Sequence, residues 1–285
     1  MTSSKTFYVQ KDDCIEIIDC TDFDITHILE CGQIFRYEKT IYGYLIHASN
    51  QEIQVYCQKG GFKIFAQNLE FAKKYFDLDN NYANIKADLL RSNLTNKAIE
   101  YGHGIRILNQ DPLEMLISFI ISANNNIPRI KKIIEALCSE VGTDMGTYRA
   151  FPTLQQLAVL TVDDYVRLGA GYRAKYLYDT VKMLNNGFDL DELYNLDTVS
   201  ARQKLLELKG VGRKVADCIL LFAYHKTDVF PTDTWIVQLY QDIYGVKKPA
   251  TFVSDYFAKL FAVNSGYAQQ YLYYEKMNNR GEKNE

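Results

Sequence analysis

A lysine beside a glycine-rich turn is the residue of this chain best suited to covalent chemistry. Lys214 follows Gly210-Val211-Gly212, and apolar helical patterns lie on both sides of the turn. This arrangement predicts two helices within about 200–222, joined by a tight hairpin that the glycines permit. The N–H groups that open the second helix would form a site for a phosphate anion. Lys214 is therefore either a phosphate ligand or a nucleophile, and the turn by itself favours the phosphate ligand.

Asp233 supplies a carboxylate 19 residues after Lys214, in the segment Pro231-Thr232-Asp233. Aspartate is a favoured helix N-cap, which is one explanation for its position. A carboxylate there can also stabilise positive charge on a sugar or assist proton transfer. An amine nucleophile with a carboxylate suits cleavage of an N-glycosidic bond through a Schiff base. Cys218, four residues beyond the lysine, would share its helix face.

The composition describes a chain that buries a core and lacks a metal-cluster motif. Of its 285 residues, 47% are hydrophobic and 24% are charged, which fits one large domain or two smaller ones. The net charge of −3 argues against a long electrostatic clamp on nucleic acid, although basic residues cluster within 129–132, 167–175 and 202–214. The six cysteines form no Cys-x-x-Cys pair, so we expect no zinc, no iron–sulfur cluster and no other cofactor. Without a membrane-span or signal-peptide pattern, we expect a soluble intracellular protein with no membrane partner.

The chain changes character near residue 95, which predicts an α+β fold. Residues 1–95 have β-branched and aromatic segments between glycine turns, which predict an antiparallel sheet domain. The predicted strands are Phe7–Val9, Ile15–Ile18, Ile34–Tyr37, Tyr42–His47, Glu52–Tyr56 and Phe62–Phe65. Two helices are predicted in the same part, at Asp24–Glu30 and Leu69–Tyr75. Residues 96–285 predict an all-helical domain that contains the hairpin, with further helices at Asp111–Ile121, Pro128–Glu140, Thr153–Leu157, Val162–Leu168, Lys175–Asn185, Asp233–Tyr244, Phe252–Phe261 and Tyr267–Met277.

Six ordered sequence blocks cover most of the chain: Cys31–Arg36, Ser122–Ile130, Gly169–Tyr176, Val211–Cys218, Pro231–Asp233 and Gly266–Gln269. In order and spacing they resemble the helix-hairpin-helix DNA glycosylase superfamily and, within it, the 8-oxoguanine DNA glycosylases. One Gly-x-Gly hairpin is a weak signal, whereas six ordered blocks are a specific one. The resemblance implies a sheet domain followed by a helix-hairpin-helix domain. It also implies a bifunctional enzyme that excises 8-oxoguanine opposite cytosine and then cuts the strand.

The same resemblance implies roles for residues around the damaged base. Lys214 corresponds to the lysine that displaces the base through a Schiff base and cuts the strand by β-elimination. Asp233 corresponds to its essential carboxylate partner. The backbone oxygen of Gly32 corresponds to the acceptor for the hydrogen at N7 of 8-oxoguanine, a position where guanine has an acceptor of its own. The other residues implied in base binding are Cys218, Pro231, Gln269 and Tyr273.

Further residues correspond to those that hold the DNA duplex. Asn124 matches the asparagine that fills the space of the flipped nucleotide, and Tyr172 matches the aromatic wedge that kinks the duplex. Arg129 and Arg173 match the arginines that read the orphaned cytosine. The backbone of Gly210 and Gly212 is implied in binding a DNA phosphate. The backbone carbonyls of Leu206, Leu208 and Val211 are implied in holding a structural, non-catalytic cation. The expected partner is double-stranded DNA containing 8-oxoguanine, bound by a monomer in a prokaryotic cytoplasm or nucleoid or in a eukaryotic nucleus.

Two other functions are consistent with parts of the sequence. An alkylbase glycosylase of the same superfamily would use the aspartate without a lysine nucleophile, so it would form no Schiff base. A non-catalytic helix-hairpin-helix module that binds nucleic acid fits the modest basic charge, but it leaves Lys214, Asp233 and Gln269 unexplained. The chain departs from the family at Lys209, where proline is usual, and at Tyr273, where many members have phenylalanine.

Overall fold

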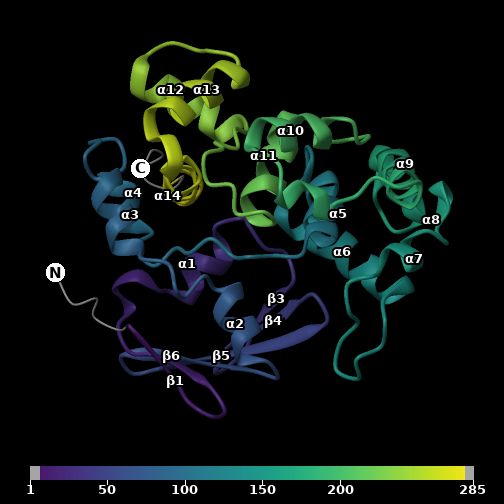
Figure 1. Cartoon of the computed structure of the whole chain (residues 1–285), viewed down its shortest axis with the longest axis horizontal. Coiled ribbons are helices and arrows are strands. Elements are labelled where there is room, and N and C mark those ends of the chain that lie inside the picture. The colour runs from purple at the N-terminus through teal and green to yellow at the C-terminus, as the bar shows by residue number, and fades with distance from the viewer. Residues whose placement is uncertain (1–6, 280–285) are drawn as a thin grey trace. The chain divides into compact units, whose positions relative to one another are not determined.

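A computed structural model describes residues 7–279 of the chain, and Figure 1 labels its helices and strands. By its contacts the chain divides into two compact units, which are described separately. The sheet unit comprises Met1–Asn109 and Tyr267–Glu285, and the helical unit is the continuous segment Gln110–Gly266. This division differs from the boundary predicted at residue 95, because residues 96–109 and the last helix make their contacts with the sheet-bearing part of the chain.

Within residues 7–279, the sheet has six strands in the order β1-β2-β6-β5-β4-β3, and every neighbouring pair is antiparallel. The strands are β1 (Tyr8–Gln10), β2 (Ile15–Ile17), β3 (Tyr37–Lys39), β4 (Gly43–Ala48), β5 (Gln51–Gln58) and β6 (Gly61–Ala66). Alternate residues such as Ile46, Ile53, Val55 and Ile64 are fully buried on one face, as the period of two requires. The predicted antiparallel sheet is confirmed, although its third strand begins at Tyr37, where the predicted segment ended.

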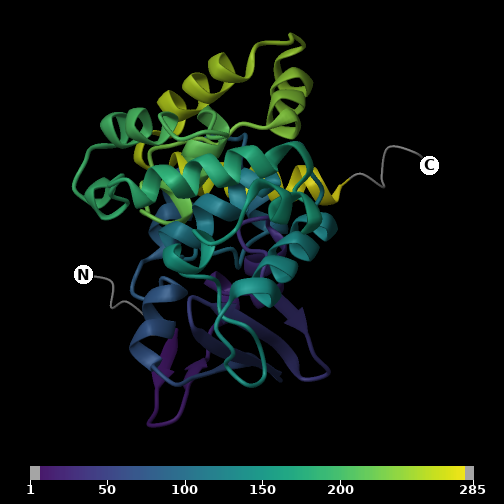
Figure 2. The ribbon, with the colours of Figure 1, turned by 90° about the vertical axis from the view of Figure 1, so that its right-hand side faces the viewer.

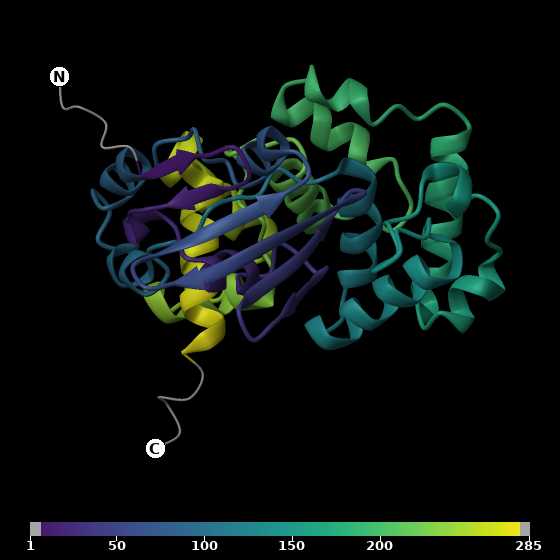
Figure 3. The same ribbon diagram turned by 90° about the horizontal axis from the view of Figure 1, so that it is seen from below.

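Helices cover the apolar face of the sheet. Those that share its buried cluster are α1 (Ile25–Glu30) and α2 (Leu69–Tyr75). The sheet unit also contains α3 (Tyr82–Leu89), α4 (Asn96–Tyr101), most of α14 (Ser265–Asn278) and a 3-10 turn η1 (Cys20–Asp22). Apolar residues of α1 and α2 share one buried cluster with the strands. In Figure 3 the yellow helix α14 crosses behind the strands. The hydroxyl of Tyr267 on α14 accepts a 3.0 Å hydrogen bond from Asn80, and its ring packs edge-on against Tyr82.

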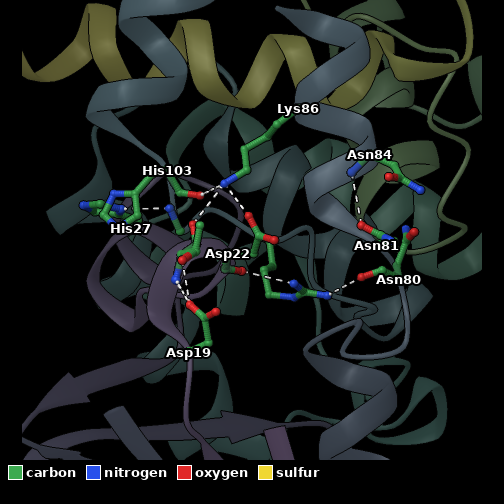
Figure 4. A network of polar contacts seen from close by, with 11 residues as sticks. Asp19, Asp22, His27, Asn80, Asn81, Asn84, Lys86 and His103 are labelled. Carbon is green, nitrogen blue, oxygen red and sulfur yellow. Dashed lines mark hydrogen bonds and ion pairs between the residues drawn. The ribbon is translucent and has the colours of Figure 1, made fainter. Parts of the chain in front are cut away.

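A buried lysine fastens α3 to two loops of the sheet unit. The amino group of Lys86 donates to the carbonyls of Thr21 (3.0 Å) and His103 (3.1 Å) and pairs with the carboxylate of Asp22, as Figure 4 shows. In the same figure, the backbone N–H of Gly104 donates to Nδ1 of His27. These bonds compensate for the burial of a charged side chain, and they explain a helix that the sequence analysis did not predict.

The helical unit is built around α5, whose residues from Glu114 to Ile121 are all buried. Its elements are α5 (Pro112–Ser122), α6 (Ile127–Val141), α7 (Leu154–Leu157), α8 (Val162–Arg167), η2 (Gly171–Arg173), α9 (Ala174–Asn185), η3 (Asp191–Tyr194), α10 (Thr198–Leu206), α11 (Arg213–Phe222), α12 (Thr234–Tyr244), α13 (Ala250–Phe261) and η4 (Ala262–Asn264). A long loop joins α6 to α7 (Figure 2). Among residues 7–279, no helix combines the length and apolar character that a membrane crossing needs.

Candidate active site

The hairpin turn between α10 and α11 is fixed by its contact with α9. Gly210 has a left-handed φ of +81°, and a Cβ at this position would lie 2.7 Å from the Cβ of Tyr176. The hydroxyl of Thr180, a buried residue of α9, donates a 2.8 Å hydrogen bond to the carbonyl of Lys209. Backbone conformation and available space therefore both require glycine at position 210.

Gly212 opens α11 and leaves the first N–H groups of the helix accessible. Its backbone is extended (φ −91°, ψ 176°), and no described side chain caps this helix. A Cβ on Gly212 would meet no atom of the described residues within 4 Å. Uncapped amides at the positive end of a helix attract an anion. Lys214 adds a positive charge in the same turn, whereas the charge of Arg213 is paired with the Asp255 carboxylate. This geometry is compatible with the predicted phosphate site, which stays a prediction.

Lys214 lies half-buried between an aromatic ring and a thiol. Its amino nitrogen is 5.2 Å from the centroid of the Phe119 ring. Cys218, one turn later on α11, is buried. Burial raises the pKa of the Cys218 thiol to about 11, and the positive charge of Lys214 acts in the opposite direction. The thiol is therefore protonated at neutral pH, so Cys218 offers an uncharged, polarisable surface beside the amine.

Asp233 at the start of α12 is both a helix cap and a largely buried carboxylate. Its Oδ1 accepts hydrogen bonds from the N–H groups of Trp235 (3.0 Å) and Ile236 (3.1 Å). Burial raises the pKa of Asp233, while these amides and the charge of Lys214 act in the opposite direction. The charge of Lys214 thus influences both Cys218 and Asp233. We call these three residues, which the structure brings together, the lysine group.

Packing against α13 places the segment that precedes Asp233. Phe230 is buried and stacks on Phe257, with ring centroids 4.9 Å apart. The carbonyl of Phe230 accepts hydrogen bonds from the hydroxyls of Thr232 (3.0 Å) and Ser254 (3.0 Å). Pro231 is buried within this segment. The position of the carboxylate is therefore set by buried contacts on both sides of the loop.

The turn between α5 and α6 carries Asn124 in a left-handed conformation, with φ +50°. The buried Arg173 supports this turn from η2. Its Nε donates to the carbonyl of Ala123 (2.7 Å), and a terminal nitrogen donates to the carbonyl of Asn124 (2.7 Å). The hydroxyl of Tyr172 also donates to the Ala123 carbonyl (3.1 Å). The structure therefore brings together Asn124, Tyr172 and Arg173, three of the residues predicted to bind DNA.

The two arginines implied in cytosine reading have different surroundings. Arg129 is exposed at the start of α6, and one of its terminal nitrogens donates to the carbonyl of Gly169 (3.3 Å). Arg173 is 3% exposed, and its guanidinium carbon lies 4.4 Å from the centroid of the Tyr172 ring. Arg129 could contact a base without losing a buried hydrogen bond. Arg173 could do so only by giving up its hydrogen bonds to the carbonyls of the α5–α6 turn, which carries Asn124.

The sheet unit carries the other residues predicted to recognise the base. Gly32 has φ +81°, and a Cβ there would lie 3.1 Å from a ring carbon of Tyr273. The tyrosine ring therefore packs directly on this glycine. Gln269, one turn earlier on α14, is buried, and its side-chain oxygen accepts a 2.7 Å hydrogen bond from Gln270.

The carbonyls predicted to hold a structural cation lie at the end of α10 and in the hairpin turn. The Leu208 carbonyl accepts a 3.2 Å hydrogen bond from the N–H of Val211, and Leu206 is the last residue of α10. In the part of the chain that the structure describes, no three His, Cys, Asp or Glu side chains are grouped to hold a metal ion. The cation stays an implication of the resemblance.

Sequence reasoning missed a buried ion pair that joins the two hairpin helices. Nε of Arg202 on α10 lies 2.6 Å from Oδ1 of Asp217 on α11, and the Asp217 side chain is 1% exposed. Burial raises the pKa of Asp217, and the guanidinium groups of Arg202 and Arg213 act in the opposite direction. The available signal was an aspartate within an otherwise apolar helix face, which predicts a buried partner.

Comparisons with known proteins bear on both units. Residues 17–116 match the N-terminal domain of 8-oxoguanine DNA glycosylases, and residues 117–261 match the HhH-GPD superfamily of base excision DNA repair proteins. A probable N-glycosylase/DNA lyase of Methanothermobacter thermautotrophicus is 31% identical in an alignment of 223 residues, and the match covers 70% of each chain. The chain belongs to the 8-oxoguanine DNA glycosylase family.

Solved structures of this family have the same fold. The 8-oxoguanine glycosylase/lyase of Clostridium acetobutylicum, in complex with dsDNA containing cytosine opposite 8-oxoG, superposes with a TM-score of 0.90 at 37% identity, covering 96% of this chain and 100% of that one. The N-glycosylase/DNA lyase of Saccharomyces cerevisiae is 37% identical in an alignment of 160 residues, and the match covers 50% of this chain and 43% of the relative. The match therefore spans less than half the length of that relative. The predicted α+β fold, with a sheet domain before a helix-hairpin-helix domain, is confirmed.

Proposed function

We propose that this member of the 8-oxoguanine DNA glycosylase family is a bifunctional glycosylase and AP lyase that excises 8-oxoguanine opposite cytosine. The lysine group at the start of α11 carries the proposal. An amine nucleophile near a largely buried carboxylate can cleave a glycosidic bond covalently, and a binding module does not need this pair. The relatives in yeast and Methanothermobacter are named for the same pair of activities.

The chemical steps start from the amine of Lys214. Its nitrogen, in the neutral form, attacks C1′ of the damaged nucleotide, while the N-glycosidic bond breaks and its electron pair leaves with the base, which takes up a proton. The attached nitrogen then loses a proton, and its electron pair expels O4′, which takes up a proton as the sugar ring opens. The product is a protonated Schiff base between the lysine and C1′. Loss of a proton from C2′ then expels the 3′ phosphate, and water later hydrolyses the Schiff base. The Asp233 carboxylate stabilises the positive charge that develops on the sugar.

Recognition of the base is assigned to the residues that the family resemblance implies. The Gly32 carbonyl accepts the N7 hydrogen that 8-oxoguanine has and guanine lacks. Gln269 contacts the pairing edge, and Tyr273 and Cys218 contact the two faces of the ring. The neutral thiol of Cys218 suits contact with an aromatic face. Pro231 completes the base-binding set.

Contacts with the DNA duplex are assigned to residues of the helical unit. The backbone amides of Gly210 and Gly212 bind a phosphate, Asn124 enters the space of the flipped nucleotide, and Tyr172 wedges beside it. Arg129 reads the orphaned cytosine. Arg173 is hydrogen-bonded to the α5–α6 turn that carries Asn124. We therefore assign its contact with the base to a DNA-bound form in which that turn is rearranged.

The decisive experiment is trapping with borohydride on a duplex that contains an 8-oxoguanine–cytosine pair. The wild-type protein should give a covalent protein–DNA adduct and a cut strand. Lys214→Gln should give neither, whereas Lys182→Gln, a change at an exposed lysine of α9, should behave as wild type. The same duplex with adenine, guanine or thymine opposite the lesion tests the preference for cytosine.

Each other outcome corresponds to a competing function. Release of the base without an adduct would identify a monofunctional, alkylbase-type glycosylase. Binding of the duplex with no release would identify a non-catalytic module. An adduct that persists in Lys214→Gln would assign the nucleophile to another amine.

A further inference from the structure

Gln33 is a polar residue with no exposure to solvent, and its amide is bonded at both ends. The side-chain nitrogen donates to the carbonyls of Ile28 (2.9 Å) and Arg106 (2.8 Å). The side-chain oxygen accepts from the N–H of Leu108 (2.9 Å). The nitrogen also donates to the Cys31 sulfur (3.2 Å). A buried amide without such bonds would destabilise the fold, so these contacts fix the side chain between the end of α1 and residues 106–108.

The segment that receives Gln33 is itself firmly anchored. The guanidinium of Arg106 is fully buried and donates to the carbonyls of Phe76 (2.9 Å), Asp22 (3.1 Å) and Asn80 (3.1 Å). Its central carbon lies 3.9 Å from the centroid of the Tyr82 ring. Displacing this backbone would break several buried hydrogen bonds at once, so Gln33 is attached to a fixed point of the sheet unit.

Gly32 is therefore restrained on both sides. Before it, the Cys31 thiol donates to the carbonyl of Ile28 (3.2 Å), and burial raises the pKa of this thiol to about 12, so the proton stays in place. After it comes Gln33. Tyr273 packs on the glycine itself. The Gly32 carbonyl belongs to the planar peptide group that it shares with Gln33, so fixing the Gln33 side chain fixes the direction of that carbonyl.

We propose that Gln33 is a positioning residue for base selection, which aims the Gly32 carbonyl at the hydrogen on N7 of the lesion. This inference rests on the proposed function, because it concerns the same pocket. Its consequence is specific: loss of the Gln33 bonds impairs excision of the damaged base, but not cleavage at an abasic site, where there is no base to recognise.

The test is Gln33→Glu, assayed for both activities. The substitution keeps the volume and an acceptor for Leu108, but it places an oxygen against the carbonyls of Ile28 and Arg106. Single-turnover excision of 8-oxoguanine should fall on the order of 10²-fold, the effect of a misplaced recognition group. Strand cleavage at a preformed abasic site should stay at the wild-type rate. Lowering the pH protonates the new carboxyl, restores one donor and should partly recover excision relative to cleavage. Gln58→Glu, on the exposed end of β5, is the matched control.

The outcomes separate this proposal from the general one. If excision and abasic cleavage fall together with the folded fraction, Gln33 has a merely structural role and the inference is wrong. An unchanged excision rate would also overturn it. If Gln33→Glu does not fold, Gln33→Asn takes its place, because its shorter amide cannot reach both carbonyls. The deciding quantity is again the rate of excision relative to the rate of cleavage at an abasic site. If the wild-type protein excises nothing, the proposed function itself has failed, whatever Gln33 does.

Discussion

At the scale of single residues, Asp233 meets two requirements that oppose each other. As the cap of α12, it needs only an oxygen acceptor for two amides. As the proposed partner of Lys214, it must be ionised in a largely buried position. Burial raises the pKa of Asp233 in the folded protein, so folding favours the protonated carboxyl. The resulting stabilisation is fully present below the pKa of the unfolded state and is lost as the pH rises through the pKa of the folded state. The ionised carboxylate therefore lowers stability at neutral pH.

Asp233→Asn separates the two requirements, because asparagine caps a helix as well as aspartate does. At pH 7 the thermal midpoint of the variant should equal or exceed that of the wild type. The difference should close as the pH is lowered and the wild-type carboxyl becomes protonated. Excision should fall on the order of 10²–10⁴-fold, with duplex binding retained. Unfolding curves across pH and single-turnover excision check both parts, and wild-type excision by Asp233→Asn would exclude the carboxylate role.

At the scale of elements, the hairpin contains two glycines that serve different purposes. Gly210 is confined by its left-handed φ and by Tyr176, so its role lies in the packing of the turn on α9. Gly212 faces open space with an ordinary φ, so nothing in the packing of the described residues requires it. Because the fold does not require glycine at position 212, we attribute this glycine to the close approach of a phosphate to the uncapped start of α11.

The matched pair Gly210→Ala and Gly212→Ala tests this distinction. Gly210→Ala should lower the free energy of unfolding by about 1–3 kcal/mol, because the left-handed backbone and the contact with Tyr176 both oppose a Cβ. Gly212→Ala should leave stability unchanged or raise it by about 0.4–1 kcal/mol, while weakening duplex binding. Chemical denaturation and a binding titration at fixed salt measure the two effects. Equal binding by Gly212→Ala and the wild type would contradict a phosphate contact there.

The elements that sequence patterns predicted are those with a regular apolar period, and α3 shows why one was missed. Its buried positions are Tyr82, Lys86 and Leu89. The middle one is a lysine, whose burial depends on Asp22 and two carbonyls distant in sequence. Local spacing likewise predicted Lys214 near Asp233. It could not predict that Arg173 supports Asn124, because those bonds join residues about 50 positions apart.

At the scale of the whole molecule, the chain enters the sheet unit twice. Residues up to Asn109 build most of it, and the chain returns at Tyr267 after the helical unit is complete. The returning helix α14 contributes Tyr267 and Tyr271, both buried, and packs on Tyr82. A helical period predicted this helix correctly, but the period does not state which unit the helix joins.

Removing residues 267–285 should therefore destabilise the sheet unit more than the helical unit. Amide hydrogen exchange measured by mass spectrometry should increase in β2, β5 and β6, while α5 and α11 keep their protection. Tyr267→Phe, which keeps the ring and removes the hydroxyl that accepts from Asn80, should cost about 0.5–1.5 kcal/mol. Undiminished protection of the strands in the truncated protein would show that α14 is dispensable to the sheet.

The double passage through the sheet unit also sets an order of events during synthesis. The helical unit has all of its residues once position 266 has been added, whereas the sheet unit waits for α14 across an insertion of 157 residues (110 to 266). At about 5–20 residues per second, that delay is roughly 8–30 s. The residues of the sheet unit that α14 contacts, among them Tyr82, lack this partner on the nascent chain during this interval. The ribosome-bound protein is thus most exposed to chaperones and to aggregation through the half that it makes first.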